Sequence, residues 1–340
     1  GKTRAEVADK LSATLSDQKK GIPIITERQT VGQFLDRWLE DCVKPTVRPN
    51  TYDSYEVHVR LYLKPDLGRI QLDKLSPQQV EAFLNAQVKA GRSPRMAQYL
   101  RSVLRIALNQ AMKWNLVVRN AAGLVDPPRY IKPEIEPFSI EQVQAFMDAS
   151  KGDRLELLFL VMLSMGLRKG EATALRWQDV DMNSGVMRVQ RSLQRIEKKY
   201  QLVELKTKRS RRTLPMPEKV ITALRTHRTR QLEERLLAAE RWKDSGFVFT
   251  TSVGTPLNPR NVLRSFHRLL EKAGIPRRGV HNLRHTCASL LLEQNVHART
   301  LMDILGHSRI SVTMDTYAHV MPPTILDAAN LMNSVISGRG

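Results

Sequence analysis

The sequence reads HNLRH at residues 281–285, LGHS at 305–308 and MDTYAH at 314–319. These three stretches place imidazoles, a guanidinium and a phenol within one C-terminal segment. If His281 begins a helix, Arg284 lies about one turn further along on the same face. The imidazole and the guanidinium can then converge on one small anion. We therefore interpret the segment as a site for chemistry on a phosphodiester.

Two further motifs precede this segment. Residues 166–171 read GLRKGE, and residues 205–215 form a basic stretch, LKTKRSRRTLP. Between Arg188 and Arg212 there are ten Lys or Arg residues against two acids. A solvated loop alone accounts poorly for such a cluster, so we expect it to contact a nucleic-acid backbone.

The whole chain is strongly basic. Its 340 residues carry a formal net charge of +20, an excess that attracts polyanions through the summed field. Nucleic acid is therefore the leading partner. A membrane surface is the rival, but the sequence contains no run of eighteen apolar residues and no signal peptide. We expect no association with a membrane.

The N-terminal half, at residues 27–125, predicts a small helical bundle. Helix-start signals occur at three places, each followed by apolar residues at helical spacing: Thr30–Gln33, Ser76–Gln79 and Ser93–Pro94. The third helix carries three basic residues, Arg95, Arg101 and Arg105. These residues fit either a DNA-facing surface or a solvated charged face.

A proline-rich linker is expected at residues 126–136, because prolines there exclude helix and stiffen an extended connection. The second domain, with a C-terminal tail, would follow at 137–340. Ser139 caps its first helix, and residues 155–165 are apolar nearly all round, which is typical of a helix buried on every side.

Alternating, β-compatible residues between Val186 and Pro215 predict a short antiparallel sheet in this domain. Further helices are expected at 217–243, at 259–274 and from 281 onward. The fold class is thus mainly α with a small antiparallel β-sheet, in two domains.

Taken in order, these motifs resemble the signature of the tyrosine recombinases, the phage-integrase family of site-specific DNA recombinases. All six functional positions of the family pattern are filled: Arg168, Lys206, His281, Arg284, His307 and Tyr317. The motifs are sharp in the C-terminal half, and the likeness is looser in the N-terminal half. The resemblance implies a two-domain DNA clamp, formed by a helical core-binding domain and a mixed α/β catalytic domain.

The resemblance also implies a role for each position. Arg168 and Arg284 would clamp the phosphate, because developing negative charge needs fixed cations and arginine does not lose its proton. Tyr317 would be the nucleophile that forms a covalent phosphotyrosine with the 3′ end of the cut strand. Lys206 would protonate the leaving 5′ oxygen as general acid, with Lys208 on the same predicted hairpin as its competitor.

His281 and His307 would bond to the phosphate oxygens, and His281 is also placed to accept the proton of the tyrosine. Glu171 follows Arg168 by three residues, so it either holds a neighbouring arginine or histidine or is a first-turn helix acid. His285 would support the site without touching phosphate. Four residues of the basic stretch are expected to contact DNA: Lys208, Arg209, Arg211 and Arg212.

We expect no metal and no other cofactor. No paired acidic motif and no His/Cys array at zinc spacing accompanies the six residues. Asp179 and Asp181 come nearest, and they are better explained as capping or turn residues. The two cysteines, Cys42 and Cys287, fall on apolar faces of expected helices, so we interpret them as reduced core residues.

The implied function is site-specific recombination through a Holliday junction, for integration or excision of a phage, a transposon or another mobile element. The partners would be double-stranded DNA, three further copies of the chain in a tetramer and an accessory directionality factor, in the cytoplasm of a bacterium near its nucleoid. Two alternatives remain open: relaxation of DNA by a type IB topoisomerase-like activity, and DNA binding without catalysis.

The two ends of the sequence carry separate expectations. Residues 1–26 are interpreted as an N-terminal extension, a candidate remnant of an arm-type DNA-binding domain. The tail at Val320–Ser337 has apolar residues at helical spacing. It would pack either on its own domain or on a neighbouring protomer.

Overall fold

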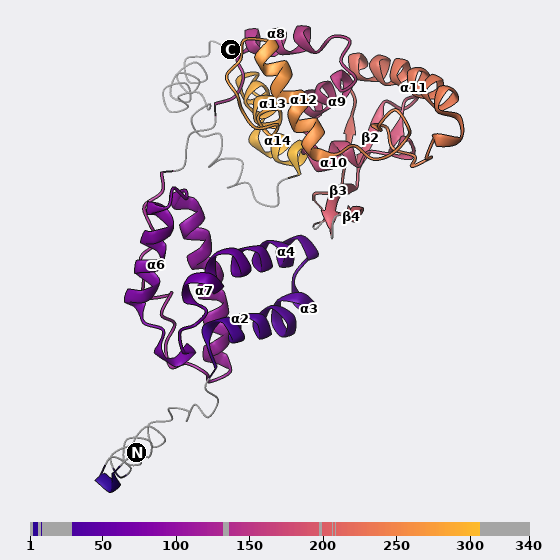
Figure 1. Cartoon of the computed structure of the whole chain (residues 1–340). Coiled ribbons are helices and arrows are strands. Elements are labelled where there is room, and N and C mark those ends of the chain that lie inside the picture. Colours follow the sequence, from indigo (N-terminus) through magenta and orange to yellow (C-terminus); the bar gives the residue numbers. More distant parts are fainter. Residues whose placement is uncertain are drawn as a thin grey trace, which may run out of the picture. The chain divides into compact units, whose positions relative to one another are not determined.

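The computed structural model describes residues 3–5, 8, 29–131, 136–196, 199–205, 207 and 209–306. The chain divides into two compact units, Gly1–Pro133 and Glu134–Gly340, and each is considered by itself (Figure 1). Most of the predicted N-terminal extension and all of the predicted C-terminal tail lie outside the described residues. So do four predicted site residues: Lys206, Lys208, His307 and Tyr317.

The first unit is a helical bundle, as predicted. Its elements are α2 (Val31–Trp38), the π-helical turn η1 (Leu39–Val43), α3 (Lys44–Thr46), α4 (Pro49–His58), the π-helical turn η2 (Val59–Leu63), α5 (Lys64–Leu67), the 3₁₀ turn η3 (Leu72–Lys74), α6 (Pro77–Lys89) and α7 (Pro94–Lys113).

The predicted helix starts of this unit are confirmed. At α2 the Thr30 hydroxyl accepts from the backbone N–H of Gln33 (3.3 Å), and the Gln33 side chain accepts from the backbone N–H of Thr30 (2.9 Å). Ser76 and Gln79 repeat this reciprocal pair at α6. Helix α4 is not anticipated by the apolar spacing, because none of its residues is buried.

Helices α2, α6 and α7 enclose the core of the first unit. Phe34, Leu84 and Leu104 are fully buried there. The Tyr55 ring stacks on Trp38 with centroids 5.8 Å apart. Tyr52, Tyr55 and Tyr62 pack against this core, whereas Tyr99 is exposed at the surface.

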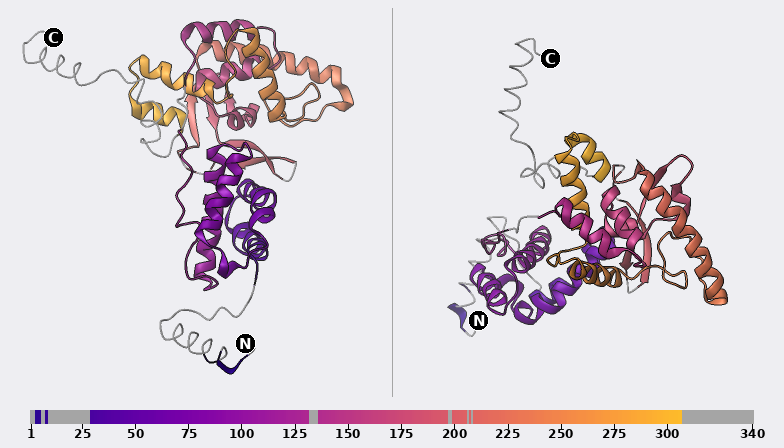
Figure 2. Two further views of the ribbon diagram at one scale, coloured as in Figure 1. Left: turned by 60° about the vertical axis from the view of Figure 1, so that its left-hand side comes forward. Right: turned by 90° about the horizontal axis from the view of Figure 1, so that it is seen from above.

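The second unit is mainly helical with small sheets. Its helices are α8 (Ile140–Ser150), α9 (Glu156–Met165), α10 (Lys169–Thr173), α11 (Glu218–Ala238), α12 (Pro259–Lys272), α13 (Asn282–Glu293) and α14 (Ala298–Leu305), with 3₁₀ turns η4 (Trp177–Asp179) and η5 (Ala239–Arg241). Figure 2 shows α11, in salmon, extending beyond the rest of this unit. None of the described helices is long and apolar enough to cross a membrane.

The predicted single sheet is two separate antiparallel sheets. One joins β1 (Val180–Asp181), β2 (Val186–Val189) and β5 (Arg212–Pro215), and the other is the hairpin of β3 (Arg191–Ile196) and β4 (Lys199–Glu204). Helices α13 and α14 follow residue 281, where helices were expected, and the helical structure breaks between them. The break lies at Asn295, whose backbone is left-handed (φ 59°).

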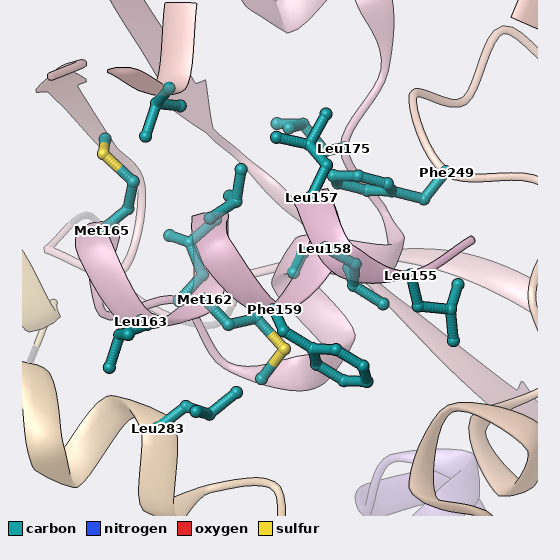
Figure 3. Packing of buried hydrophobic residues seen from close by; sticks show 14 of the residues in the cluster. Leu155, Leu157, Leu158, Phe159, Met162, Leu163, Met165, Leu175, Phe249 and Leu283 are labelled. Atoms are coloured by element: carbon teal, nitrogen blue, oxygen red, sulfur yellow. The ribbon is translucent and has the colours of Figure 1, made fainter. Parts of the chain in front are cut away.

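Helix α9 forms the centre of the second core, as its all-round apolar sequence predicts. Figure 3 shows its side chains directed to every side, among them Phe159, Met162 and Leu163, with Phe249 and Leu283 from other segments around them. Phe159 also packs edge-on against Phe146 of α8, with ring centroids 5.7 Å apart.

Both cysteines are free thiols. Cys287 is buried beside Gly166, and burial raises the pKa of its thiol to about 11. Cys42 is partly buried and packs against the first core. The interpretation as a core residue is thus confirmed for Cys287, whereas Cys42 lies at the edge of its core.

Replacement of Phe159 by alanine tests the central place of α9. We expect Phe159→Ala to lower the free energy of unfolding of the second unit by about 3–5 kcal/mol, because a fully buried ring is lost and a cavity remains. Leu236→Ala, at a side chain 80% exposed on α11, should change it by less than about 0.5 kcal/mol. Denaturant titration measures both values, and equal effects of the two variants would contradict this account of the core.

Candidate catalytic site

Arg168 lies at the junction of two helices in the second unit. Helix α9 ends at Gly166, whose left-handed backbone (φ 60°) turns the chain toward Arg168. The backbone N–H of Arg168 donates to Glu171 Oε2 (3.0 Å), and its Nη1 donates to Glu171 Oε1 (2.7 Å). The Arg168 side chain remains 36% exposed, so it can still meet an anion from solvent.

Glu171 is the buried counter-charge of this site. Its side chain is 1% exposed, and its Oε2 also accepts from Arg212 Nη2 at 3.0 Å. Burial alone would raise the pKa of Glu171, but the charges of Arg212 and Arg168 outweigh burial and hold the pKa below its ordinary value. One ionised carboxylate therefore holds two arginines in place.

Arg212 is an interior residue, unlike the exposed arginines of the same basic stretch, and its contact with DNA stays a prediction. Its side chain, at the start of β5, is 6% exposed. Besides the bond to Glu171, its Nε donates to the carbonyl of Ile304 (2.6 Å) and its Nη1 to the carbonyl of Ser210 (3.1 Å). The guanidinium is enclosed, and its donors are directed to protein acceptors.

Arg284 joins the C-terminal ends of two helices. It lies in the first turn of α13 and is 4% exposed. Its Nη1 donates to the carbonyl of Gly166, just after α9, and its Nη2 donates to the carbonyl of Leu305 in α14 (2.7 and 2.6 Å). Carbonyls at helix ends lack partners within their own helix, so Arg284 both satisfies them and fixes the two ends beside each other.

His281 is the residue that caps α13, so Arg284 follows it by one helical turn as the spacing predicts. His281 is exposed to solvent. Partial burial lowers the pKa of His281, and the neighbouring cations Lys169, Arg284 and Arg168 lower it further. The imidazole is therefore neutral at neutral pH and can accept a proton.

Lys169 belongs to the same group of cations, although the sequence pattern does not single it out. It is half-buried at the first position of α10, and burial lowers the pKa of its ammonium group. Its only signal in the sequence is that it adjoins Arg168. Three predicted site residues, Arg168, His281 and Arg284, thus come together with Lys169 where α9, α10 and α13 meet.

The remaining predicted DNA contacts differ in exposure. Arg101 is half-buried, and its Nε donates to the carbonyl of Val125 (2.6 Å). His285 is also half-buried, and its supporting role stays a prediction. Four residues have exposed side chains and stay predicted DNA contacts: Arg95, Arg105, Arg209 and Arg211.

The two aspartates nearest to a metal motif serve local structure, as predicted. Asp179 accepts from the backbone N–H of Arg176 (3.3 Å), and Asp181 Oδ1 accepts from the backbone N–H groups of Asn183 and Ser184 (3.0 Å each). Across the described residues, no group of three or more His, Cys, Asp or Glu side chains is placed to hold a metal ion.

Comparison with known families assigns the chain. The sequence model of the Phage integrase family matches residues 135–322, and that of the phage integrase N-terminal SAM-like domain matches residues 30–87. A tyrosine recombinase XerC-like protein of Caldanaerobacter subterraneus is 33% identical over 98% of this chain and 90% of its own length. An integrase of Streptomyces ambofaciens is 30% identical over 98% of this chain and 88% of its own.

Solved structures share the fold. The Tn1549 transposon integrase in complex with a circular intermediate DNA superposes with a TM-score of 0.76 at 22% identity, over 90% of this chain and 99% of that one. A lambda integrase tetramer bound to a Holliday junction superposes with a TM-score of 0.64 at 16% identity, over 86% of this chain and 78% of that one.

The chain therefore belongs to the phage integrase family and is a site-specific tyrosine recombinase that acts on DNA. The predicted fold class, mainly helical with small antiparallel sheets, is confirmed by the structure and by these relatives.

Replacement of Glu171 by glutamine tests the buried counter-charge. We expect Glu171→Gln to destabilise the second unit by about 3 kcal/mol at pH 7, because two arginines lose their carboxylate partner. The pKa of Glu171 in the folded state lies below 4.5, its ordinary value. The stabilisation that the ionised Glu171 gives to the wild-type protein is therefore fully present above about pH 4.5. It is lost as the pH falls through the lowered pKa.

Denaturant titrations between pH 3 and pH 8 measure this dependence. Glu233→Gln, at an exposed glutamate on α11, is the matched control and should leave the stability nearly unchanged at every pH. If the stability difference between wild type and Glu171→Gln increased as the pH fell, the role of Glu171 as an ionised counter-charge would be contradicted.

Proposed function

We propose that this recombinase cleaves and rejoins DNA with the six residues Arg168, Lys206, His281, Arg284, His307 and Tyr317. The observation that carries the proposal is the convergence of Arg168, His281 and Arg284 from separate elements. Arg168 donates to Glu171, Arg284 donates to the carbonyl of Gly166, and both guanidiniums lie near enough to His281 to lower its pKa. The Phage integrase match, at 135–322, also includes all six positions.

In the cleavage step, the Tyr317 oxygen attacks phosphorus in line with the leaving 5′ oxygen. A bond forms between phosphorus and the phenol oxygen as the bond to the 5′ oxygen breaks, and the 3′ side of the strand stays joined to the enzyme. His281, neutral in the free enzyme, accepts the phenol proton, and Lys206 donates a proton to the leaving oxygen. Arg168, Arg284 and His307 meet the negative charge on the non-bridging oxygens.

In the joining step, the freed 5′ hydroxyl of a partner strand attacks the phosphotyrosine and releases the enzyme. The energy of the original phosphodiester is conserved, so no cofactor is needed for ligation. Two rounds of exchange form and resolve a Holliday junction, as required for integration or excision of a mobile element. The working unit is a homotetramer on two duplexes in the bacterial cytoplasm, and an accessory factor sets direction.

The same cluster supports catalysis over DNA binding alone. A DNA-binding protein without catalysis has no need of a buried Glu171 that orients an exposed Arg168. A topoisomerase-like enzyme would use similar chemistry but would rejoin only its own strand. Recombinant products from two identical target sites therefore decide between recombination and relaxation.

Replacement of Tyr317 by phenylalanine tests the nucleophile. On a nicked duplex from which the short cleaved strand escapes, the wild-type enzyme should accumulate a covalent protein–DNA adduct. Tyr317→Phe should form none above background and should still bind the duplex, because only the phenol oxygen is removed. Tyr52→Phe is the matched control, since Tyr52 donates to Glu40 (2.7 Å) in the first unit and should leave the adduct intact. An adduct with Tyr317→Phe would reject the assignment.

The pH dependence of adduct formation tests the role of His281. A group that must be neutral, and whose pKa is lowered below 6.5, supports activity above that pKa and loses it as the pH falls through it. We expect kcat/KM for cleavage to decline on the acid side with an apparent pKa below 6.5. His281→Asn should be slow at all pH values and lack this decline, whereas His267→Asn on α12 should retain it. A decline that persists in His281→Asn would exclude this role.

A further inference from the structure

The last carbonyls of α14 are bound by two enclosed guanidiniums. Arg212 Nε donates to the carbonyl of Ile304, and Arg284 Nη2 donates to that of Leu305, each at 2.6 Å. Such carbonyls have no partner within their own helix, and cations favour the helix C-terminus electrostatically. The end of α14 is therefore tied to β5 and to α13 by two separate cations.

The chain leaves α14 in close contact with the same guanidinium. Gly306 has a left-handed backbone (φ 66°), and a Cβ there would lie 3.0 Å from Arg212 Nη1 and 3.2 Å from the carbonyl of Arg209. The exit from α14 is thus packed directly against Arg212. In the sequence, His307 follows Gly306 at once.

Arg212 also reaches the phosphate-binding side of the site. Its Nη2 donates to Glu171 Oε2 (3.0 Å), and Glu171 Oε1 accepts from Arg168 Nη1 (2.7 Å). One interior side chain therefore connects three segments: β5, the end of α14 and, through Glu171, the cap of α10. Its side chain is 6% exposed, and its Nε, Nη1 and Nη2 all donate to protein acceptors.

We propose that Arg212 is a positioning residue for strand cleavage, which sets the direction of Arg168 through Glu171 and fixes the exit of the chain from α14 through Ile304. This inference rests on the proposed catalytic roles. Arg212 itself touches no substrate. Loss of the Arg212 guanidinium slows strand cleavage and leaves the affinity for DNA unchanged.

Two other roles for Arg212 make different predictions. If Arg212 contacted DNA, its loss would weaken binding. It would also reduce the slope of log affinity against log salt concentration by about one. A merely structural arginine would lower stability but leave the rate of cleavage unchanged at temperatures where the variant is folded. A positioning arginine changes the rate of cleavage at saturating DNA.

The experiment compares Arg212→Met and Arg212→Lys with wild type in single-turnover adduct formation at saturating DNA. We expect Arg212→Met to cleave about 100-fold more slowly, the order of loss that misplacing a reacting group by about 1 Å produces. The affinity for DNA and its salt slope should match wild type. Arg212→Lys restores a cation beside Glu171 without the planar fork, so it should recover part of the rate.

The matched control is Arg235→Met, which removes a surface arginine on α11 that pairs with Asp244 (3.3 Å). It should cleave at the wild-type rate. Thermal unfolding of each variant, followed by rate measurements well below its midpoint, separates a loss of positioning from a loss of fold.

A double-mutant cycle guards against an Arg212→Met protein that folds poorly because Glu171 loses a partner. Glu171→Gln combined with Arg212→Met removes both charges of the buried pair. If Arg212 acts through Glu171, the double variant should cleave about as slowly as the slower single variant. If the fold-reductions in cleavage rate of the two single variants multiply in the double variant, Arg212 does not act through Glu171.

The outcomes also separate this inference from the proposed catalytic roles. If the adduct depends on Tyr317 but Arg212→Met cleaves DNA at the wild-type rate, the positioning role of Arg212 is overturned and the catalytic roles stand. Weaker binding of Arg212→Met with a reduced salt slope and an unchanged maximal rate overturns it in favour of DNA contact. An adduct that persists in Tyr317→Phe overturns the catalytic roles themselves.

Discussion

A buried carboxylate between two guanidiniums holds the catalytic unit of this recombinase together. Glu171 is nearly inaccessible, and an isolated charge at such a depth would be costly, so Arg168 and Arg212 must stay beside it. Helix α10, which carries Glu171, has only five residues and could not be stable alone. The ion pairs therefore fix a short element and, with it, the partly exposed side chain of Arg168.

The same concentration of positive charge prepares the site for its substrate. Partial burial lowers the pKa of His281, and the neighbouring cations Lys169, Arg284 and Arg168 lower it further. Arg284 is held by carbonyls at the ends of two helices, which fix the position of its guanidinium. Over the whole chain the net charge of +20 attracts DNA to the protein.

Local signals in the sequence anticipate much of this architecture. Capping boxes at Thr30 and Ser76 begin helices, and the apolar run of α9 is buried on every side, because both depend on neighbouring residues alone. Helix α4 escapes such reasoning since it buries no residue. The interior position of Arg212 could not be predicted in this way either, because its bonds to Glu171 and Ile304 join residues that are 41 and 92 positions away in the sequence. A basic stretch has the same composition whether its side chains face DNA or the protein interior.

The most direct test of the account is to locate the covalent bond between protein and DNA. Trypsin digestion of the trapped adduct should yield the peptide from Ile310 to Arg339, in which Tyr317 is the one tyrosine. Mass spectrometry should find the nucleotide on Tyr317, attached through the 3′ phosphate of the cleaved strand. A nucleotide on any other residue, or one attached through a 5′ phosphate, would contradict the proposed mechanism.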